Sequence, residues 1–285
     1  MPLTFIRHLK TSFQVLVVVF LLLSLKGSAR GAISNRLDEV LMHLEANLRG
    51  FDSAIPDFFC SEQAVSQYIS PTVNRITQID STFRVKRTDE GHTQLSFVES
   101  RQIISVNGHQ VGTRDVDEPI TVAGMFEGGL AIVSLSQEHC MRYTLGKDKH
   151  LGSKDYYVVE FVTLDAVTAH EDCILREKSN GYALIEKLSL HINTITINTP
   201  HHLLRSDDKS TSPNSGRAPL FGRRTVMVQY SPVSLDRSTF WLPTVIHTRI
   251  ITGENGFHPM TWSFEGNYSD YHKLEVTSQI LPAKP

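Results

Sequence analysis

Two short runs hold the side chains best suited to metal or acid–base chemistry: His170, Glu171, Asp172 and Cys173 in the first, and His201 and His202 in the second. Imidazole, carboxylate and thiolate groups are ligands that zinc prefers in proteins. Adjacent residues on an extended chain point to opposite sides, so they seldom bind one ion together. Neither run has the spacing of a known zinc motif. We therefore predict no metal site and no bound cofactor.

Nucleophilic catalysis has no recognisable signature in the chain. Ser61, Ser134 and Ser136 lack the Gly-x-Ser-x-Gly context of a hydrolase nucleophile. Cys60 has no basic neighbour in sequence that would make its thiol reactive. The chain is therefore not predicted to be an enzyme. A hydrolase whose site is assembled from distant histidines and carboxylates is a weaker alternative.

Three cysteines allow one disulfide within the chain and leave at least one thiol unpaired: Cys60, Cys140 and Cys173. We expect three consecutive strands around the last two, namely Met141 to Leu145, Tyr156 to Leu164 and Ile174 to Lys178. Cys140 and Cys173 would then stand two strands apart, at about 9.5 Å. A disulfide needs Cα atoms within about 7 Å. This strand order therefore disfavours the Cys140–Cys173 pair, and the sequence does not fix which two cysteines are bonded.

The first 31 residues have the parts of a secretory signal peptide. Arg7 and Lys10 supply a basic start, Phe13 to Leu25 is apolar apart from two residues, and small residues follow. Thirteen residues rise only about 20 Å as a helix, short of the roughly 30 Å hydrocarbon core of a membrane. We predict that this leader is removed on export. An uncleaved membrane anchor is the alternative, favoured by Lys26 and Arg30 beyond the apolar run.

Removal of the leader leaves residues 32–285, a length that one β-rich domain can reach. The leader holds four of the 28 basic side chains and none of the 30 acidic ones. The mature chain therefore has 24 basic and 30 acidic side chains and a net charge of −6, against −2 for the precursor. A negative surface repels phosphate backbones, so nucleic-acid binding is not expected.

One amphipathic helix and a series of turns organise the mature chain. Residues 33–49 have apolar side chains at helical spacing, and Gly50 fits the position just past a helix end. Four dipeptides favour tight hairpin turns between strand-like segments: Glu90-Gly91, Asn107-Gly108, Asn180-Gly181 and Asn255-Gly256. Such turns join antiparallel strands. The sequence therefore predicts a mainly β (α+β) fold: a curved antiparallel sheet, or half-barrel, with the N-terminal helix packed on it.

Two stretches interrupt the strand pattern. Ser206 to Gly222 is rich in Ser, Asp, Pro and Gly and is expected to form a flexible loop. Thr113 to Gly129 is rich in glycine and is expected to form a short helix or a flap over one sheet face.

Aromatic residues suggest where a ligand could bind. On the strand expected at Tyr156 to Leu164, Tyr157, Val159 and Phe161 share one face, and the other face is also largely apolar. A strand that is apolar on both sides needs cover on both sides, which one helix cannot provide for a whole sheet. Either the strands form a closed barrel or a two-sheet sandwich with a packed core, or a curved sheet leaves an apolar hollow for a ligand. We take these three residues, with Trp262 and Phe264, as candidate lining of that hollow.

Several local segments resemble one group of secreted proteins: Phe58-Phe59-Cys60-Ser61-Glu62, Val106-Asn107-Gly108, Tyr230-Ser231-Pro232, Phe240-Trp241-Leu242-Pro243 and the closing run from Phe264 to Tyr271. Together with the order of leader, helix and meander, they resemble the LolA-like and LppX-like half-barrel carriers of the bacterial periplasm and secreted bacterial proteins of that outline. The resemblance spans roughly residues 36 to 282. It implies a periplasmic, non-enzymatic carrier, and no functional residue of those carriers matches a position here.

The expected function is binding of a hydrophobic ligand, either a lipid or a lipidated partner, in the periplasm of a Gram-negative-type bacterium. Contact with a membrane would be transient, or would pass through an uncleaved leader. The main alternative is a structural or interaction module of the cell envelope whose core is filled.

Overall fold

The computed structural model describes residues 36–88, 96–111, 126, 128–165, 172–204, 221–253 and 259–274. Within these ranges the strands are β1 (Phe58–Ile69), β2 (Asn74–Thr88), β3 (Ser96–Val106), β4 (His109–Gln110), β5 (Met141–Leu145), β6 (Lys149–Leu151), β7 (Lys154–Thr163), β8 (Asn180–Glu186), β9 (Ile192–Leu203), β10 (Phe221–Leu235), β11 (Ser238–Thr252) and β12 (Met260–Lys273). Two short helices, α2 (Gly128–Ala131) and η1 (Leu135–Gln137), and a longer one at residues 36–54 complete the described elements.

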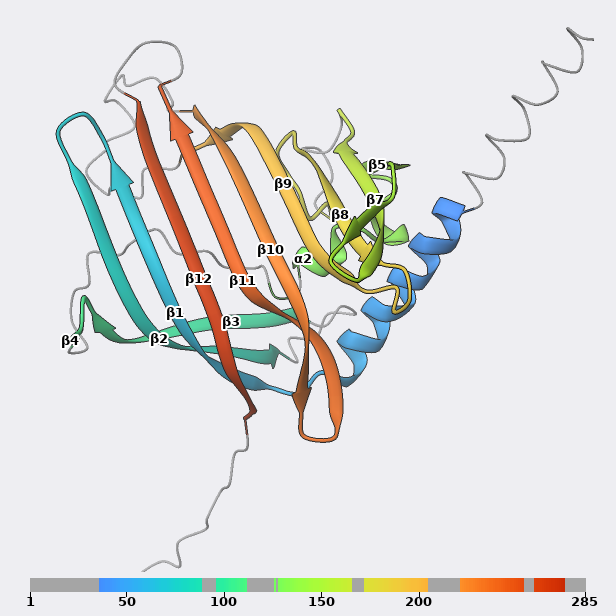
Figure 1. The fold of residues 1–285 in the computed structure, drawn as a ribbon, viewed down its shortest axis with the longest axis horizontal. Helices are drawn as coiled ribbons and strands as arrows, with labels where there is room; N and C mark the ends of the chain where they lie inside the picture. The colour runs from blue at the N-terminus through green and yellow to red at the C-terminus, as the bar shows by residue number, and fades with distance from the viewer. Residues whose placement is uncertain are drawn as a thin grey trace, which may run out of the picture.

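All the described strands belong to one antiparallel sheet. Its order is β4-β3-β2-β1-β12-β11-β10-β9-β8-β7-β5, and β6 pairs with β7. Most neighbours in the sheet are consecutive in sequence, but β1 pairs with β12, so the first and last strands meet near the middle of the sheet. Figure 1 shows one broad, strongly twisted sheet that does not close into a barrel. The predicted curved antiparallel sheet with a packed helix is confirmed.

The helix at residues 36–54 packs against one face of the sheet, the face that carries main-core residues such as Phe58, Phe161 and Ile195. We call this the inner face. Val40 and Leu41 are followed about one turn later by Leu44 on the same side of the helix, and all three are buried in the main core. In Figure 1 the helix runs beside one end of β8 and β9 before the chain enters β1. The helix continues past Gly50, so the prediction that Gly50 ends it is wrong. Phe51 and Ile55 extend the apolar side, which is a reason for the helix to continue.

The main core lies between the inner face, this helix and α2. Its largest fully buried side chains include Leu41, Ile55, Phe58, Phe83, Phe126, Ile132, Met141, Ile185, Ile195 and Tyr230. A smaller cluster of Ala64, Ile79 and Phe264 lies farther along β1, β2 and β12. The prediction that β7 is apolar on both sides is confirmed. Val159 and Phe161 enter the main core, whereas Tyr156 and Val158 pack with Leu184 in a separate cluster.

Of the four predicted turns, the structure describes two. Asn107 and Gly108 connect β3 and β4 with φ angles of 50° and 76°, as a type I′ turn requires. Glu90-Gly91 and Asn255-Gly256 lie outside the described residues. The prediction of a turn at Asn180-Gly181 is wrong, because both residues belong to β8.

Gly181 has a packing role instead of a turn role. It is the register partner of Phe161 on β7. A Cβ atom added to Gly181 would lie 2.0 Å from the backbone oxygen of Thr196 and 2.5 Å from the Phe161 ring. The glycine therefore lets neighbouring strands and an aromatic ring approach one another.

The prediction that one thiol stays unpaired is confirmed, but the expectation against a Cys140–Cys173 bond is wrong. Cys140 and Cys173 form a disulfide, with Cα atoms 5.7 Å apart, and Cys60 is a free buried thiol. β5, β7 and β8 are indeed neighbours in the sheet, but residues 174–178 form no strand. Cys173 lies in the connection before β8 and is therefore not held at the distance of two strands from Cys140.

Other predictions concern residues that the structure does not describe. The leader at residues 1–31 lies outside the described ranges, and so do residues 206–220 of the expected loop, whereas Phe221 and Gly222 begin β10. Within Thr113 to Gly129, the described Gly128 and Gly129 begin the short helix α2. Among the described helices, none is long and apolar enough to cross a membrane.

Candidate ligand groove

A groove of about 330 Å³ lies between the helix at 36–54 and one end of the sheet. This volume falls at the lower end of the range of about 300–1,000 Å³ that small-molecule sites occupy. Its lining comes from the helix, from α2 and from the starts of β9 and β11: Leu44, Ala46, Asn47, Leu48, Gly50, Phe51, Ala54, Leu130, His191, Ile192, Ser238, Thr239, Phe240 and Trp241.

The helix supplies one apolar wall of the groove. Leu44, Leu48 and Phe51 stand three or four residues apart and therefore share one side of the helix. Leu44 and Phe51 belong to the main core, whereas Leu48 is only half-buried and lines the groove. The apolar side of the helix thus serves the core and the groove together.

The sheet supplies the opposite wall through two aromatic contacts. Phe240 meets Phe51 of the helix edge to face, with ring centroids 6.3 Å apart. The half-buried Trp241 stacks on the imidazole of His191, with centroids 4.8 Å apart and planes 25° from parallel. The β10–β11 hairpin carries both aromatic residues, and its turn is made by Asp236, with a φ of 57°, and Arg237.

One hydrogen bond ties the two walls together. The Asn47 amide donates to the backbone oxygen of Leu190 at 2.8 Å, which joins the helix to the connection between β8 and β9. Leu190 has a φ of 53°, a conformation that leucine seldom adopts. This hydrogen bond holds the β8–β9 connection, which continues into His191, against the helix.

The groove has little charge. None of the lining residues is acidic, and His191 is the one titratable side chain among them. Burial lowers the pKa of His191 below its ordinary value of 6.5, although Glu186 opposes the shift. The imidazole is therefore neutral near pH 7, and the lining suits an apolar molecule with a few hydrogen-bonding groups.

None of the five residues predicted from the sequence lines this groove. Val159, Phe161 and Phe264 are almost completely buried. Tyr157 is half-buried beneath the Arg36 guanidinium, and the Trp262 ring lies 5.3 Å from that of Tyr68. Their role in lining a ligand site stays a prediction.

Sequence reasoning missed the groove residues because they come from distant segments. Leu44 and Leu48 were visible as part of an apolar helix side, and Phe240-Trp241 as a motif of the resemblance. Nothing in the sequence indicated that the helix would meet the β10–β11 hairpin.

A buried polar cluster occupies the inner face elsewhere. The Glu62 carboxylate on β1 accepts hydrogen bonds from Ser81 on β2, from both Nε and a terminal nitrogen of Arg101 on β3, and from Tyr268 on β12 at 2.8 Å. Burial alone would raise the pKa of Glu62, but the Arg101, Ser81 and Tyr268 donors outweigh it and lower that pKa. Glu62 follows Cys60 of the main core and precedes Ala64 of the smaller cluster on the same face of β1.

Both carboxylate oxygens of Glu62 already accept hydrogen bonds within the cluster, so we assign the cluster a structural role. The pKa of Tyr268 is raised, first by burial and then by the adjacent Glu62 carboxylate, so its hydroxyl stays protonated and donates. Four strands are held together by these contacts.

Comparison with known proteins gives structural neighbours and no sequence family. No family model matches the chain, and no curated protein matches it. A LolA superfamily protein from Nitrosomonas europaea is 11% identical, with a TM-score of 0.32, and the match covers 83% of this chain and 94% of that one.

Two further solved structures are similar at the same level. A domain assigned to outer membrane lipoprotein sorting from Vibrio parahaemolyticus is 12% identical, with a TM-score of 0.35, covering 82% of this chain and 92% of that one. A DUF1329 family protein from Desulfovibrio piger is 10% identical, with a TM-score of 0.37, covering 86% and 95%.

Proposed function

We propose that the protein binds a hydrophobic ligand, a lipid or the acyl chain of a lipidated partner, and releases it chemically unchanged. The observation that carries this proposal is the groove between the helix and the β10–β11 hairpin. Its walls are mainly apolar, and its one titratable side chain is neutral near pH 7. No carboxylate or other charged side chain among the lining residues would have to be desolvated when an apolar ligand enters.

The energetics of an acyl ligand favour this role. Each methylene of an acyl chain that is buried in the groove contributes roughly 0.8 kcal/mol before the costs of binding. Binding driven by such burial needs no specific polar contact, which fits the lack of a sequence motif. Asn47, His191, Ser238 and Thr239 at the groove could hydrogen-bond a carboxyl or ester group.

The proposed location is the periplasm, reached through the leader. N-terminal sequencing of exported protein should give a start near Arg30 or Ala32. An intact Met1 on membrane-bound protein would instead support an uncleaved anchor.

A second candidate function has an observation of its own. The inner face is occupied by a continuous packed core from the helix to β12, as a structural module of the cell envelope would have. In that case the groove would be a surface irregularity without a ligand.

Native mass spectrometry separates these functions. Delipidated full-length protein is exposed to envelope lipids and then weighed without denaturation. A lipid adduct of unchanged mass supports the carrier, and absence of adducts supports the module. A lipid released with altered mass would indicate an enzyme.

A further inference from the structure

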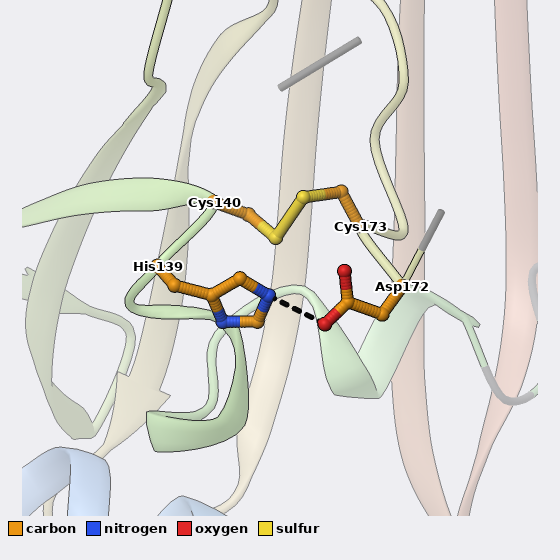
Figure 2. Close-up of side chains that lie close together, drawn as sticks. All are labelled: His139, Cys140, Asp172 and Cys173. Atoms are coloured by element: carbon orange, nitrogen blue, oxygen red, sulfur yellow. Dashed lines mark hydrogen bonds and ion pairs between the residues drawn. A yellow bond between two sulfur atoms is a disulfide. The ribbon is translucent and has the colours of Figure 1, made fainter. Parts of the chain in front are cut away.

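The disulfide stands beside a histidine and a carboxylate. Figure 2 shows His139, Cys140, Asp172 and Cys173 around one point, with the imidazole directed at the carboxylate. The His139 Nε2 atom lies 2.7 Å from an Asp172 carboxylate oxygen. The potential ligand atoms of all four residues lie within 4.8 Å of one another.

Two turns bring these residues together. His139 and Cys140 end the turn after η1, immediately before β5, and Asp172 and Cys173 lie in the connection that leads to β8. Because neither pair is on a strand, adjacent side chains need not point to opposite sides. Adjacent residues in these turns can therefore bind one ion together, unlike adjacent residues on a strand.

We propose that these four residues form a zinc site when the disulfide is reduced. A dithiol reductant supplies two electrons and two protons: the bond between the Cys140 and Cys173 sulfurs breaks, two thiols form, and the reductant closes into its own disulfide. Zn²⁺ then displaces both thiol protons. It is held by two thiolates, the His139 imidazole and the Asp172 carboxylate, which together carry three negative charges.

The spacing suits a tetrahedral site after small rotations. With Zn–S of about 2.3 Å and Zn–N or Zn–O of about 2.0–2.2 Å, neighbouring ligand atoms stand about 3.3–3.8 Å apart. The two sulfurs move apart once their bond is broken, and the His139 and Asp172 atoms separate slightly from 2.7 Å. The same residues cannot hold zinc in this way while they are oxidised, because a disulfide offers no thiolate.

The four residues differ in exposure: the histidine and the carboxylate are open to solvent, and the two cysteines are shielded from it. Cys140 and Cys173 are 0% and 3% exposed, so their thiolates would lie away from water. The side chains of His139 and Asp172 are 44% and 63% exposed. An ion therefore approaches from the His139–Asp172 side and reaches the sulfurs behind it.

The consequence is that one junction is clamped in both redox states. Either a disulfide or a zinc ion joins the start of β5 to the connection before β8. The four residues of the zinc site lie outside the ligand groove and share no residue with its lining.

The test is a cobalt titration of full-length protein carrying Cys60→Ala, so that the third thiol cannot contribute. The protein is reduced with dithiothreitol, freed of reductant without oxygen, and titrated with Co²⁺, which gives a strong ultraviolet band when thiolates bind it. We expect one equivalent of Co²⁺ with this band in the reduced protein, displacement by Zn²⁺, and no band in the oxidised protein. A reduced protein without the band would overturn the proposal.

Single-residue variants distinguish Zn²⁺ binding at this site from nonspecific metal binding. His139→Ala and Asp172→Asn should each weaken Zn²⁺ binding by more than about tenfold. His150→Ala is the matched control, because His150 forms a similar exposed pair with Asp155 at 2.8 Å and neither residue belongs to the group of four potential ligands. Equal effects of all three variants would overturn the proposal. If the reduced protein loses its native circular dichroism, Zn²⁺ should restore it, and failure to do so also contradicts the site.

Discussion

Arg101 on β3 reaches past β2 and holds both carboxylate oxygens of Glu62 on β1. The Arg101 guanidinium also lies 5.2 Å from the Phe83 ring centre and 6.0 Å from that of Phe264. The side chain of Glu62 is 0% exposed. A charge pair this deeply buried is costly to break on one side only.

Removal of one partner should therefore cost more than removal of both. Arg101→Met leaves Glu62 buried without its cation, and we expect a loss of about 3–5 kcal/mol in the free energy of unfolding. The double variant Glu62→Gln/Arg101→Met should lose less than Arg101→Met alone. Urea denaturation of the two single variants and the double variant measures this. Additive losses would show that the pair is not coupled.

The same pair predicts how stability depends on pH. The pKa of Glu62 in the folded protein is lowered, so the stabilising contribution of its ionised form is complete above its unfolded pKa of about 4.5. That contribution is lost as the pH falls below this value and through the folded pKa. Unfolding free energies measured from pH 6 to pH 3 should fall more steeply for the parent than for Glu62→Gln/Arg101→Met. Parallel curves would contradict this assignment.

Gly181 should not tolerate a side chain. A methyl group there meets the Thr196 backbone oxygen, which cannot move aside without disturbing β9. We expect Gly181→Ala to lower the free energy of unfolding by about 1–3 kcal/mol. Gly50→Ala is the matched control, since Gly50 lies in the helix with nothing within 4 Å of an added Cβ, and it should raise stability by about 0.5–1 kcal/mol. The prediction fails if thermal denaturation gives the two variants the same sign.

The disulfide should make a large contribution to stability. Cys140 and Cys173 are 33 residues apart, a separation for which loop-closure entropy gives about 4 kcal/mol. Cys140→Ala/Cys173→Ala should lose an amount of this order on chemical denaturation.

Burial raises the pKa of the Cys60 thiol to about 12, so the folded parent should not react with a thiol reagent at neutral pH. Rapid labelling of folded parent would contradict this.

The sheet and the helix could be predicted from local sequence patterns, because each depends on residues that are close together in the sequence. The helix was visible from Leu37, Val40, Leu41 and Leu44, and the Asn107-Gly108 turn from the positive φ angles that this dipeptide favours. Asn180-Gly181 is the same dipeptide, but its glycine leaves room for the Phe161 ring on the neighbouring strand β7. A dipeptide does not reveal which of these two roles its glycine has.

The features missed from the sequence depend on contacts between distant segments. The Cys140–Cys173 bond depends on residues 174–178 being a connection, although Ile174 and Leu175 look strand-like. The groove depends on the docking of the helix near Trp241, and the buried pair on the alignment of Glu62 with Arg101 across β2. Apolar periodicity carries no information about these alignments.

Uptake of a fluorescent fatty acid by delipidated protein tests the proposed function most directly. Leu48→Glu places a charge in the groove wall, and Leu151→Glu makes the same change on the exposed strand β6, where Leu151 is 50% exposed. We expect the parent and Leu151→Glu to bind the probe equally, and Leu48→Glu to bind at least about tenfold more weakly, which corresponds to ~1.4 kcal/mol. Absence of uptake by the folded parent, or equal uptake by all three proteins, would contradict the proposal that this groove holds a hydrophobic ligand.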